Sequence, residues 1–356
     1  MKITRWAAAG LAAVLLAGMS ITAHAQSYTV ASIGPSGSTF SLPYAVNDHG
    51  QAVGKSYLTT PNGWAFIFTA ATGLQLLPAL AGSSWSEADD INHNGQVVGF
   101  CVSATASTGF LWDSTNGTRQ IDQIADSKGV TAARLGWTIW RGRAINSIGD
   151  ILCWGTRSGV RSLGIWHMAT DLFGATALTV TLVPNHSEWN YFDLNDNGVV
   201  LTDVWNQAAS AYVFGLWDSN SGAFSTFLAP SFTRGYALNN HGVAVSFDGL
   251  IYSPDNGITQ LGSLGAGAAY TTAYDVNDIS QVVGYSGAKH SSTPIAFLWQ
   301  NGVMKDLRTL SNADTRWQFH NASSASNPSN ASGTAGYIVG WGSYKNQNVG
   351  WILTPK

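Results

Sequence analysis

Hydrophobic and polar positions along this chain form short, strand-length runs separated by turn residues, and the arrangement of these runs repeats. The sequence DINHNGQVVG at residues 90–99 returns as DVNDISQVVG at residues 275–284. A repeat period of about 20–50 residues is typical of solenoids, propellers and arrays. The repeat therefore limits the fold more than any other feature of the sequence. Weaker copies begin at Ala45, Ala144, Asp193 and Ala237.

An asparagine in the turn marks each copy of the repeat. Successive turn markers lie 45, 54, 49, 44, 38 and 50 residues apart, which leaves room for four short strands per unit. The turn markers are Asn47, Asn92, Asn146, Asn195, Asn239, Asn277 and, in a degraded seventh copy, Asn327.

The order of signals within each unit is typical of antiparallel strands. A β-branched run follows the Asn-x-x-Gly turn, and an aromatic strand such as AFLW at residues 296–299 comes next. A second turn with Asn-Gly or Ser-Gly is a strong hairpin signal. No stretch has a sustained helical period with capping residues, so almost no helix is expected. The pattern predicts an all-β, seven-bladed β-propeller, with six or eight blades as alternatives because units three and seven diverge.

The two ends of the chain are expected to close the ring together. The seventh unit stops at Lys356, just after its third strand, and residues 28–33 form a lone strand before the first turn. We expect the N-terminal strand to complete the last blade, because this pairing removes an exposed sheet edge.

Residues 1–25 have the three parts of a secretory signal peptide. Lys2 and Arg5 supply the positive start, residues 7–17 are apolar, and Ala23-His24-Ala25 is a small-x-small cleavage site. The apolar stretch is shorter than the roughly 20 residues that span a bilayer, which disfavours a membrane anchor. We therefore expect a secreted protein, periplasmic or extracellular, with one propeller domain over residues 26–356.

Composition narrows the range of partners. Charged residues make up 10% of the chain and the net charge is −3, so the sequence predicts neither nucleic-acid binding nor membrane insertion. The chain contains 15 Trp. We expect a monomer whose partner is a polysaccharide or glycan, with a protein partner as the alternative.

Several of these segments resemble a known family. The turn phrase, residues 296–307 and LGSLG at residues 261–265 resemble the bacterial HAF-repeat family of extracellular proteins. The resemblance covers nearly all of the chain after residue 25, with close matches in units two and six. Ile295 stands where the histidine in the family's name would be, so no role is carried over to that position. The resemblance implies secretion and a repeat fold, and it implies no established activity.

Two cysteines, Cys101 and Cys153, follow the turns of neighbouring units. Their offsets from the turn markers are both odd, so the two side chains are expected on the same face of their strands. An oxidising compartment permits a disulfide between the units, and two buried thiols are the equal alternative.

The turn phrases also resemble the start of a calcium-binding loop. Asp90-x-Asn92-x-Asn94-Gly95 lacks the acidic residue that ends such a loop. A plain hairpin turn is favoured, since Asn and Gly suit turns with positive φ. We therefore expect no metal and no cofactor, and we interpret the histidines in the turns as surface residues: His49, His93 and His241.

Function is expected on the opposite edge of the ring, in the loops between blades and between second and third strands. Positions seven and five residues before each turn marker vary between units, as expected of loops that carry function on a fixed scaffold. Aromatic rings and guanidinium groups suit sugars and carboxylates. For each single Trp, the alternative to a binding role is that its ring packs between neighbouring blades as part of the core. The binding candidates are Trp85, Trp140, Trp189, Trp205, Arg157, Tyr285 and Trp341.

Two functions follow from these residues. The first is a binding module that recognises a glycan or a cell-surface or extracellular polymer. The second is a polysaccharide lyase, in which an arginine would neutralise a uronate and a His or Tyr would move the proton. A lyase predicts one pocket where these groups converge, whereas a lectin-like ring predicts several similar pockets. The sequence leaves open whether the protein is an enzyme. The catalytic candidates are Arg141, Arg234, His186, His290, His320, Tyr191 and Tyr236.

Overall fold

A computed structural model gives the fold of the chain. It describes residues 28–35, 37, 39–58, 62–170, 175–184, 192–206, 210–227, 235–264, 270–287 and 294–356, and for 203–206, 211–212 and 225–227 the backbone only. The expected signal peptide, residues 1–25, lies outside the described residues. Within the described part, no helix is long and apolar enough to cross a membrane.

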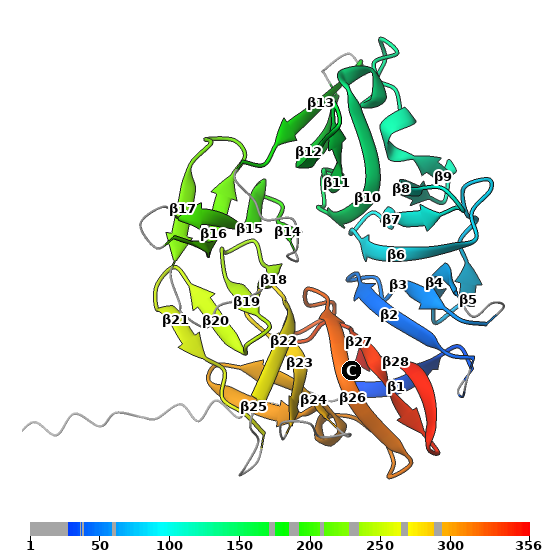
Figure 1. Ribbon diagram of the computed structural model, residues 1–356. Coiled ribbons are helices and arrows are strands. Elements are labelled where there is room, and N and C mark those ends of the chain that lie inside the picture. Colours follow the sequence, from blue (N-terminus) through cyan, green and yellow to red (C-terminus); the bar gives the residue numbers. More distant parts are fainter. Residues whose placement is uncertain are drawn as a thin grey trace, which may run out of the picture.

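Strands of the described residues form seven four-stranded antiparallel sheets that stand around a central channel (Figure 1). Blade 1 consists of β2 (Ser41–Val46), β3 (Ala52–Ser56), β4 (Trp64–Thr69) and β5 (Gly73–Leu76). Blade 2 consists of β6 (Trp85–Ile91), β7 (Val97–Val102), β8 (Ser107–Asp113) and β9 (Gly117–Gln120). Blade 3 consists of β10 (Trp137–Ile145), β11 (Ile151–Arg157), β12 (Val160–Thr170) and β13 (Thr176–Leu182).

The second half of the ring has the same strand order. Blade 4 consists of β14 (Asp193–Leu194), β15 (Val199–Asn206), β16 (Ala211–Asp218) and β17 (Phe224–Phe227). Blade 5 consists of β18 (Gly235–Leu238), β19 (Ala244–Ser246), β20 (Leu250–Ser253) and β21 (Gly257–Gln260). Blade 6 consists of β22 (Tyr270–Val276), β23 (Val282–Gly287), β24 (Ile295–Gln300) and β25 (Val303–Asp306).

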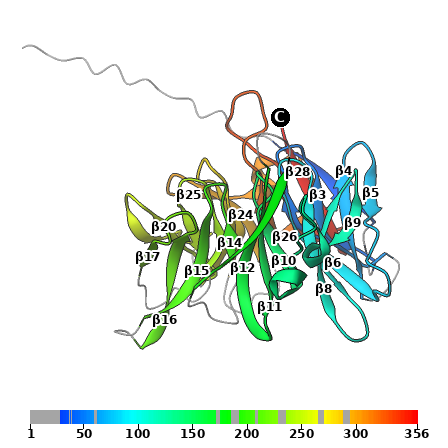
Figure 2. The same cartoon turned by 90° about the horizontal axis from the view of Figure 1, so that it is seen from above.

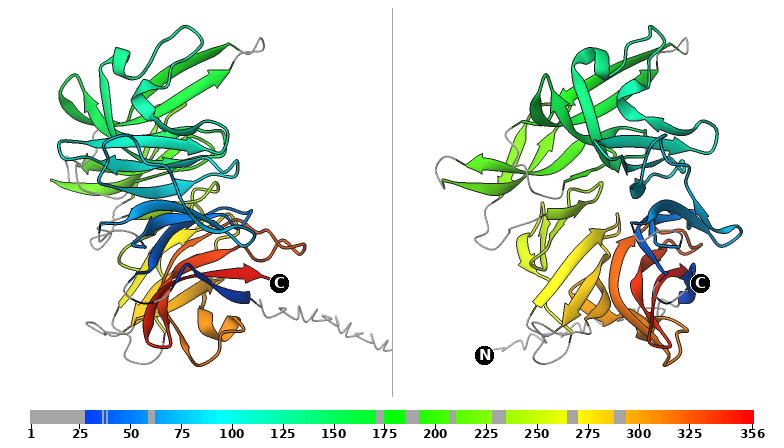
Figure 3. Two further views of the ribbon diagram at one scale, coloured as in Figure 1. Left: turned by 90° about the vertical axis from the view of Figure 1, so that its right-hand side faces the viewer. Right: turned by 45° about the vertical axis from the view of Figure 1, so that its right-hand side comes forward.

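Blade 7 combines the two ends of the chain, as the sequence predicts. It consists of β26 (Trp317–Ala325), β27 (Ile338–Tyr344), β28 (Gln347–Pro355) and β1 (Tyr28–Ile33). Strand β1 pairs with β28 from Tyr28 opposite Pro355 to Ile33 opposite Gly350. The blue β1 and the red β28 lie side by side in Figure 1 and in both views of Figure 3. The predicted seven-bladed propeller and its closure are therefore confirmed.

Helical structure in the described residues is limited to three short 3-10 segments, in agreement with the expected near-absence of helix. These are η1 (Ile121–Gln123), η2 (Ala133–Leu135) and η3 (Leu307–Leu310). Seen at a right angle to the channel, the blades form a short, wide ring (Figure 2).

The turn markers link the blades to one another. In the first six blades the asparagine marker donates from Nδ2 to the backbone oxygen of the next marker, over 2.9–3.3 Å. Its Oδ1 accepts a backbone N–H four residues later, as Asn92 does from Gln96 at 3.0 Å. Asparagine recurs here because one side chain both closes its own turn and holds the neighbouring blade.

The seventh turn marker is Ser326, one residue earlier than the sequence predicts. Asn277 Nδ2 donates to the Ser326 backbone oxygen at 3.0 Å, and the Ser326 hydroxyl accepts from Tyr337 N at 2.9 Å. The prediction of Asn327 as the marker is wrong, because its side chain instead donates to Asp278 Oδ2 at 2.8 Å. The position five residues before the marker is consequently Asn321 in blade 7.

The hydrophobic cores lie between the blades, and this location excludes a bridge between the two cysteines. Cys101 packs in the core shared by blades 1 and 2, whereas Cys153 packs in the core shared by blades 2 and 3. The predicted common face is confirmed, since both side chains face the preceding blade. Blade 2 therefore separates them, and both thiols are free and buried. The disulfide alternative is wrong.

A β-bulge recurs in the first strand of six blades. The extra residue lies three positions before the turn marker, as Tyr44 does between Pro43 and Ala45. The same register shift occurs in blades 2, 3, 5, 6 and 7. A bulge redirects the side chain of its extra residue. The bulge residues are Tyr44, Asp89, Arg143, Tyr236, Tyr274 and Ser323.

Candidate binding site

The central channel has two different mouths. The turn markers surround one mouth, which we call the turn mouth, and the first-strand bulges surround the other, which we call the bulge mouth. A cavity of about 480 Å³ occupies the bulge mouth, and all seven blades contribute to its lining. This is the face on which the sequence predicts function.

The bulge residues provide much of the lining of this cavity. Five of the six, all but Ser323, are aromatic or charged, and all six line the cavity. Residues two positions earlier, such as Glu87 and Arg141, add to the same wall. Phe192 takes the equivalent place in blade 4. The bulges therefore concentrate large side chains where the channel opens.

One side of the cavity, on blades 1 to 3, carries an ionic network. Arg141 donates from Nε to Asp89 Oδ2 at 2.6 Å and from Nη2 to Glu87 Oε1 at 3.4 Å. Lys55 Nζ lies 3.5 Å from Glu87 Oε2, and Arg143 Nη1 lies 3.7 Å from Asp89 Oδ1. Three cations thus share two carboxylates.

Aromatic rings extend this ionic side. The Lys55 Nζ lies 4.0 Å from the centre of the Trp85 ring, and the Arg141 guanidinium carbon lies 4.5 Å from the centre of the Phe100 ring. Trp85 and Phe100 meet edge to face at 5.2 Å. Trp85, a predicted binding residue, therefore contacts the ionic network beside the cavity through Lys55.

The opposite side, on blades 5 and 6, is aromatic. Tyr236 and Tyr274 contact each other edge to face, with ring centres 4.9 Å apart. Tyr274 lies 5.7 Å from Tyr285 in turn, and Tyr285 lies 5.7 Å from Tyr270. Phe247 stacks on Tyr236 at 6.2 Å. Half-buried tyrosines that also line a cavity offer a flat apolar surface with a polar edge.

Blade 7 completes the wall with a stacked pair. The rings of His320 and Trp341 are 5.4 Å apart and inclined by only 12°. Trp341 lines the cavity, whereas His320 lies outside its lining. Burial lowers the pKa of His320, so the imidazole that supports Trp341 is neutral at pH 7.

Burial also changes the acid–base properties of the wall. It raises the pKa of Glu87, and the neighbouring Asp89 adds to the rise, while Arg141 and Lys55 oppose it. Burial raises the pKa of Tyr44 strongly, with Glu87 as the next cause. A phenol with a raised pKa is deprotonated to a smaller extent at neutral pH, so Tyr44 keeps its proton there and is not available as a general base.

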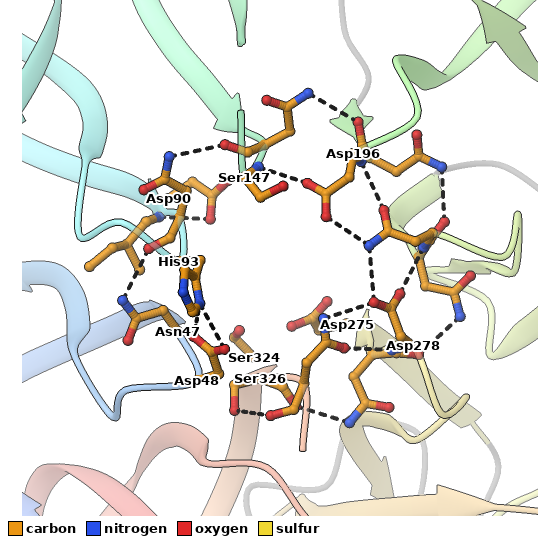
Figure 4. A pocket seen from close by; sticks show the side chains of 18 of the residues that line it. Asn47, Asp48, Asp90, His93, Ser147, Asp196, Asp275, Asp278, Ser324 and Ser326 are labelled. Carbon is orange, nitrogen blue, oxygen red and sulfur yellow. Dashed lines mark hydrogen bonds and ion pairs between the residues drawn. The ribbon is translucent and has the colours of Figure 1, made fainter. Parts of the chain in front are cut away.

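Three aspartates lie deeper in the channel, two residues before the turn markers of blades 2, 4 and 6. We call Asp90, Asp193 and Asp275 the inner aspartates. Each accepts a backbone N–H of the following blade at 2.8 Å, from Ile145, Leu238 and Ala325 respectively. Burial raises their pKa values, to about 8 for Asp90 and about 6 for Asp193. Figure 4 shows Asp90 and Asp275 in the ring around the channel.

The calcium-like phrase serves as a hairpin turn, which is the interpretation that the sequence favoured. Asp90 bonds to two backbone N–H groups, of Ile91 and Ile145. Asn92 bonds within its turn and to the next blade. Asn92 Oδ1 accepts the backbone N–H of Gln96 at 3.0 Å. The side-chain oxygens of Asp90 and Asn92 therefore serve backbone hydrogen bonds.

The structure brings some of the predicted residues together and separates others. Arg141, Tyr236 and Trp341 line one cavity, and Tyr285 contacts Tyr274, which also lines it. Trp85 contacts Phe100 and Lys55, which lie behind the lining. His320 supports Trp341 from outside. Trp140 and Arg157 lie elsewhere on blade 3 and take no part in the lining.

The remaining candidates cannot be placed in this geometry. His186, Trp189, Tyr191, Arg234 and His290 lie outside the described residues, and Trp205 is described by its backbone alone. Sequence reasoning missed Lys55, Tyr44, Asp89 and Tyr274 as members of the site. A large residue recurs three positions before the turn marker, and this signal could have identified the last three.

Comparisons with known protein families and with characterised protein sequences give no match. Solved structures with a similar fold include the β-propeller domain of the Trilobed protease from Pyrococcus furiosus, at 10% identity and a TM-score of 0.49 over 92% of this chain and 97% of that one. A gluconolactonase from Xanthomonas campestris is 8% identical, with a TM-score of 0.43 over 92% of each chain.

TolB from Acinetobacter baumannii is 13% identical, with a TM-score of 0.40 over 64% of this chain. The match spans about half the length of TolB, 52%. These likenesses concern the fold alone. The chain is a seven-bladed β-propeller, and its activity has to be argued from its own residues.

Proposed function

We propose that the protein is a secreted binding module that recognises a glycan, on a cell surface or in an extracellular polymer, at the bulge mouth. The observation that carries the proposal is the two-sided wall of the 480 Å³ cavity. Secretion rests on the pattern of residues 1–25 and on the resemblance to the HAF-repeat family, and membership of that family is part of the proposal.

The aromatic side supports a sugar ligand. Tyr236, Tyr274 and Trp341 line the cavity from three blades, and flat rings of this kind can pack against the apolar face of a pyranose. The ionic side supplies hydrogen-bond donors for hydroxyl or carboxylate oxygens. A wall with both chemistries suits an amphipathic ligand such as a sugar chain.

The lyase is the second candidate, because Arg141 and Tyr236 line the same cavity. Two observations favour binding over elimination. Arg141 is held by Asp89 and Glu87, so its charge is already shared with two carboxylates. His320 lies outside the lining, which leaves the expected set of Arg, Tyr and His incomplete among the described residues.

A glycan array combined with polysaccharide pulldown tests the proposal. We expect the purified protein to bind a defined group of glycans, and we expect Trp341→Ala and Tyr274→Ala to weaken binding roughly tenfold or more. Trp140→Ala is the matched control, since it removes a tryptophan that does not line the cavity. Equal loss in all three variants would contradict a site at the bulge mouth.

The same samples distinguish the lyase. Elimination creates an unsaturated uronate, which is detected by its ultraviolet absorbance. If the unaltered protein forms this product and the Tyr236→Phe and Arg141→Lys variants do not, the protein is an enzyme and the proposal of a binding module is wrong. Neither binding nor product would overturn both candidates and leave a protein partner to be sought.

A further inference from the structure

At the turn mouth, one residue of each blade faces its neighbours around the channel. These rim residues directly follow the turn markers. In four junctions, from blade 3 to blade 7, the backbone N–H of one rim residue donates to the side-chain oxygen of the next, over 2.7–2.8 Å. The rim residues are Asp48, His93, Ser147, Asp196, Asn240, Asp278 and Asn327. Figure 4 labels Asp48, His93, Ser147, Asp196 and Asp278 among them.

The junction of blades 1 and 2 departs from this pattern. His93 Nδ1 lies 2.9 Å from both carboxylate oxygens of Asp48. His49 Nδ1 approaches the same carboxylate, 3.3 Å from Oδ1. The two imidazole rings are 4.5 Å apart. One carboxylate and two imidazoles, drawn from two blades, thus place potential metal-binding atoms within 4.8 Å of one another.

Hydrogen bonds fix the backbone that carries these side chains. The Asn47 side chain donates to the Asn92 backbone oxygen at 3.0 Å and accepts from His49 N at 3.1 Å. The Asn94 side chain donates to the Ser147 backbone oxygen at 2.9 Å. Both turns are therefore held relative to each other before any ligand binds, which lowers the cost of assembling a site.

The cluster is open to solvent. The His49 and His93 side chains are 55% and 56% exposed. Asp48 and His93 also line a cavity of about 340 Å³ at the turn mouth. An ion can therefore reach the three groups without movement of the blades.

We propose that Asp48, His49 and His93 bind a divalent transition-metal ion of the Zn²⁺ type. Imidazole nitrogen and carboxylate oxygen are ligands for Zn²⁺, Co²⁺ and Cu²⁺, whereas Ca²⁺ and Mg²⁺ require sites made of oxygens. The ion joins blades 1 and 2 and replaces the hydrogen bonds between the histidines and Asp48. Three protein ligands leave a coordination position for water or for a ligand at the turn mouth.

His241 provides a matched control within the same protein. It occupies the position of His49 in the turn of blade 5, and its N–H donates to Asn239 Oδ1 at 3.0 Å, as His49 does to Asn47. Its rim neighbours are Asn240 and Asp278, and within the described part of the chain no second histidine joins it in a cluster of metal-binding groups. A general affinity of exposed histidines for metals would affect His241 and His49 alike.

The test is titration of the purified, untagged protein with Zn²⁺ by calorimetry and with Co²⁺ by visible absorption. We expect one ion per chain, with a Co²⁺ spectrum of low coordination number. His49→Ala, His93→Ala and Asp48→Asn should each weaken binding by roughly tenfold or more, since even outer-shell substitutions cost 10–100-fold. His241→Ala should bind as the unaltered protein does.

Folding defects are separated from lost ligands by a second set of variants. His49→Gln and His93→Gln retain a side chain that can donate to Asp48, so they should fold normally and still lose the metal. Zn²⁺ should raise the melting temperature of the unaltered protein and of His241→Ala, and it should leave that of the two Gln variants unchanged. Absence of saturable binding, or equal loss in His241→Ala, would overturn the proposal.

Discussion

At the scale of single residues, each inner aspartate is half-buried in the channel wall and accepts two backbone N–H groups. Burial dominates and raises the pKa of Asp90 to about 8. The folded protein therefore holds a proton on Asp90 at pH values where the unfolded chain, with an ordinary Asp pKa of about 3.9, has released it.

This difference predicts how stability depends on pH. The contribution of Asp90 to the free energy of unfolding is fully present below about pH 4 and is lost as the pH rises towards about 8. Over this range the free energy of unfolding falls by up to about 1.4 kcal/mol per pH unit. Asp90→Asn should remove that slope, measured as the free energy of unfolding between pH 5 and 9. Asp193→Asn should act in a lower range, because the pKa of Asp193 is about 6. If the free energies of unfolding of Asp90→Asn and of the unaltered protein differed by the same amount at every pH, the raised pKa of Asp90 would be contradicted.

The turn markers give a second prediction at this scale. Asn92 is buried and makes three hydrogen bonds, to Gln96 twice and to the backbone of Asn146. Asn92→Ala should destabilise the protein by roughly 2–4 kcal/mol, since each bond contributes about 1 kcal/mol and buried partners are left unpaired. Asn94→Ala removes one exposed bond from the same turn and should cost less than about 1 kcal/mol. Chemical denaturation measures both, and similar losses would contradict the structural role of the marker.

At the scale of strands, the β-bulge determines which side chains reach the bulge mouth. It also brings two backbones close together. A methyl group added to Gly284 would lie 2.0 Å from the Thr272 backbone oxygen, and Gly54 and Gly99 have the same contact in their blades. Glycine recurs there because the carbonyl oxygen occupies the space of a side chain.

Gly284→Ala should therefore destabilise the protein by about 3 kcal/mol, because neither backbone can move without breaking the strand pairing. Gly302→Ala is the control. Gly302 has φ of 80° and no atom within 4 Å of an added methyl group, so the change should cost only about 1 kcal/mol of conformational energy. Thermal unfolding of both variants gives the comparison, and equal shifts would refute the steric explanation.

The strands also show what the sequence could and could not predict. Periodic turns and β-branched runs predicted the blades, because each unit repeats local signals that need no knowledge of its neighbours. The bulges were not predicted, although a large residue such as Tyr44 or Asp89 recurs three positions before the turn marker, because a bulge is defined by how its strand pairs with the neighbouring strand. For the same reason the ionic network was missed as a unit: Lys55, Asp89 and Arg141 come from three blades and meet only when the ring forms.

At the scale of the whole molecule, ring closure rests on β1. Tyr28 and Ile33 at its two ends are fully buried. A chain that begins at Gly34 should lose about 3–6 kcal/mol from these two side chains and expose β28 as an unpaired edge. We expect a lower melting temperature and aggregation, seen by light scattering on heating. A chain that begins at Gln26 is the control, and equal stability of the two would contradict closure by β1.

The inner aspartates have a consequence for the ring as a mechanical object. Blades 2, 4 and 6 each hold the following blade through an inner aspartate, whereas the equivalent positions of the other blades are Ala45, Ala144, Ala237 and Ser324. Seven is an odd number, so strict alternation around a closed ring is impossible, and blade 1 lacks this link on both sides. Both chain ends lie in blade 7, so pulling on them should first separate β1 from β28. Blade 1 should then unfold as a single unit and the remaining blades in pairs, which the step lengths in single-molecule pulling would measure.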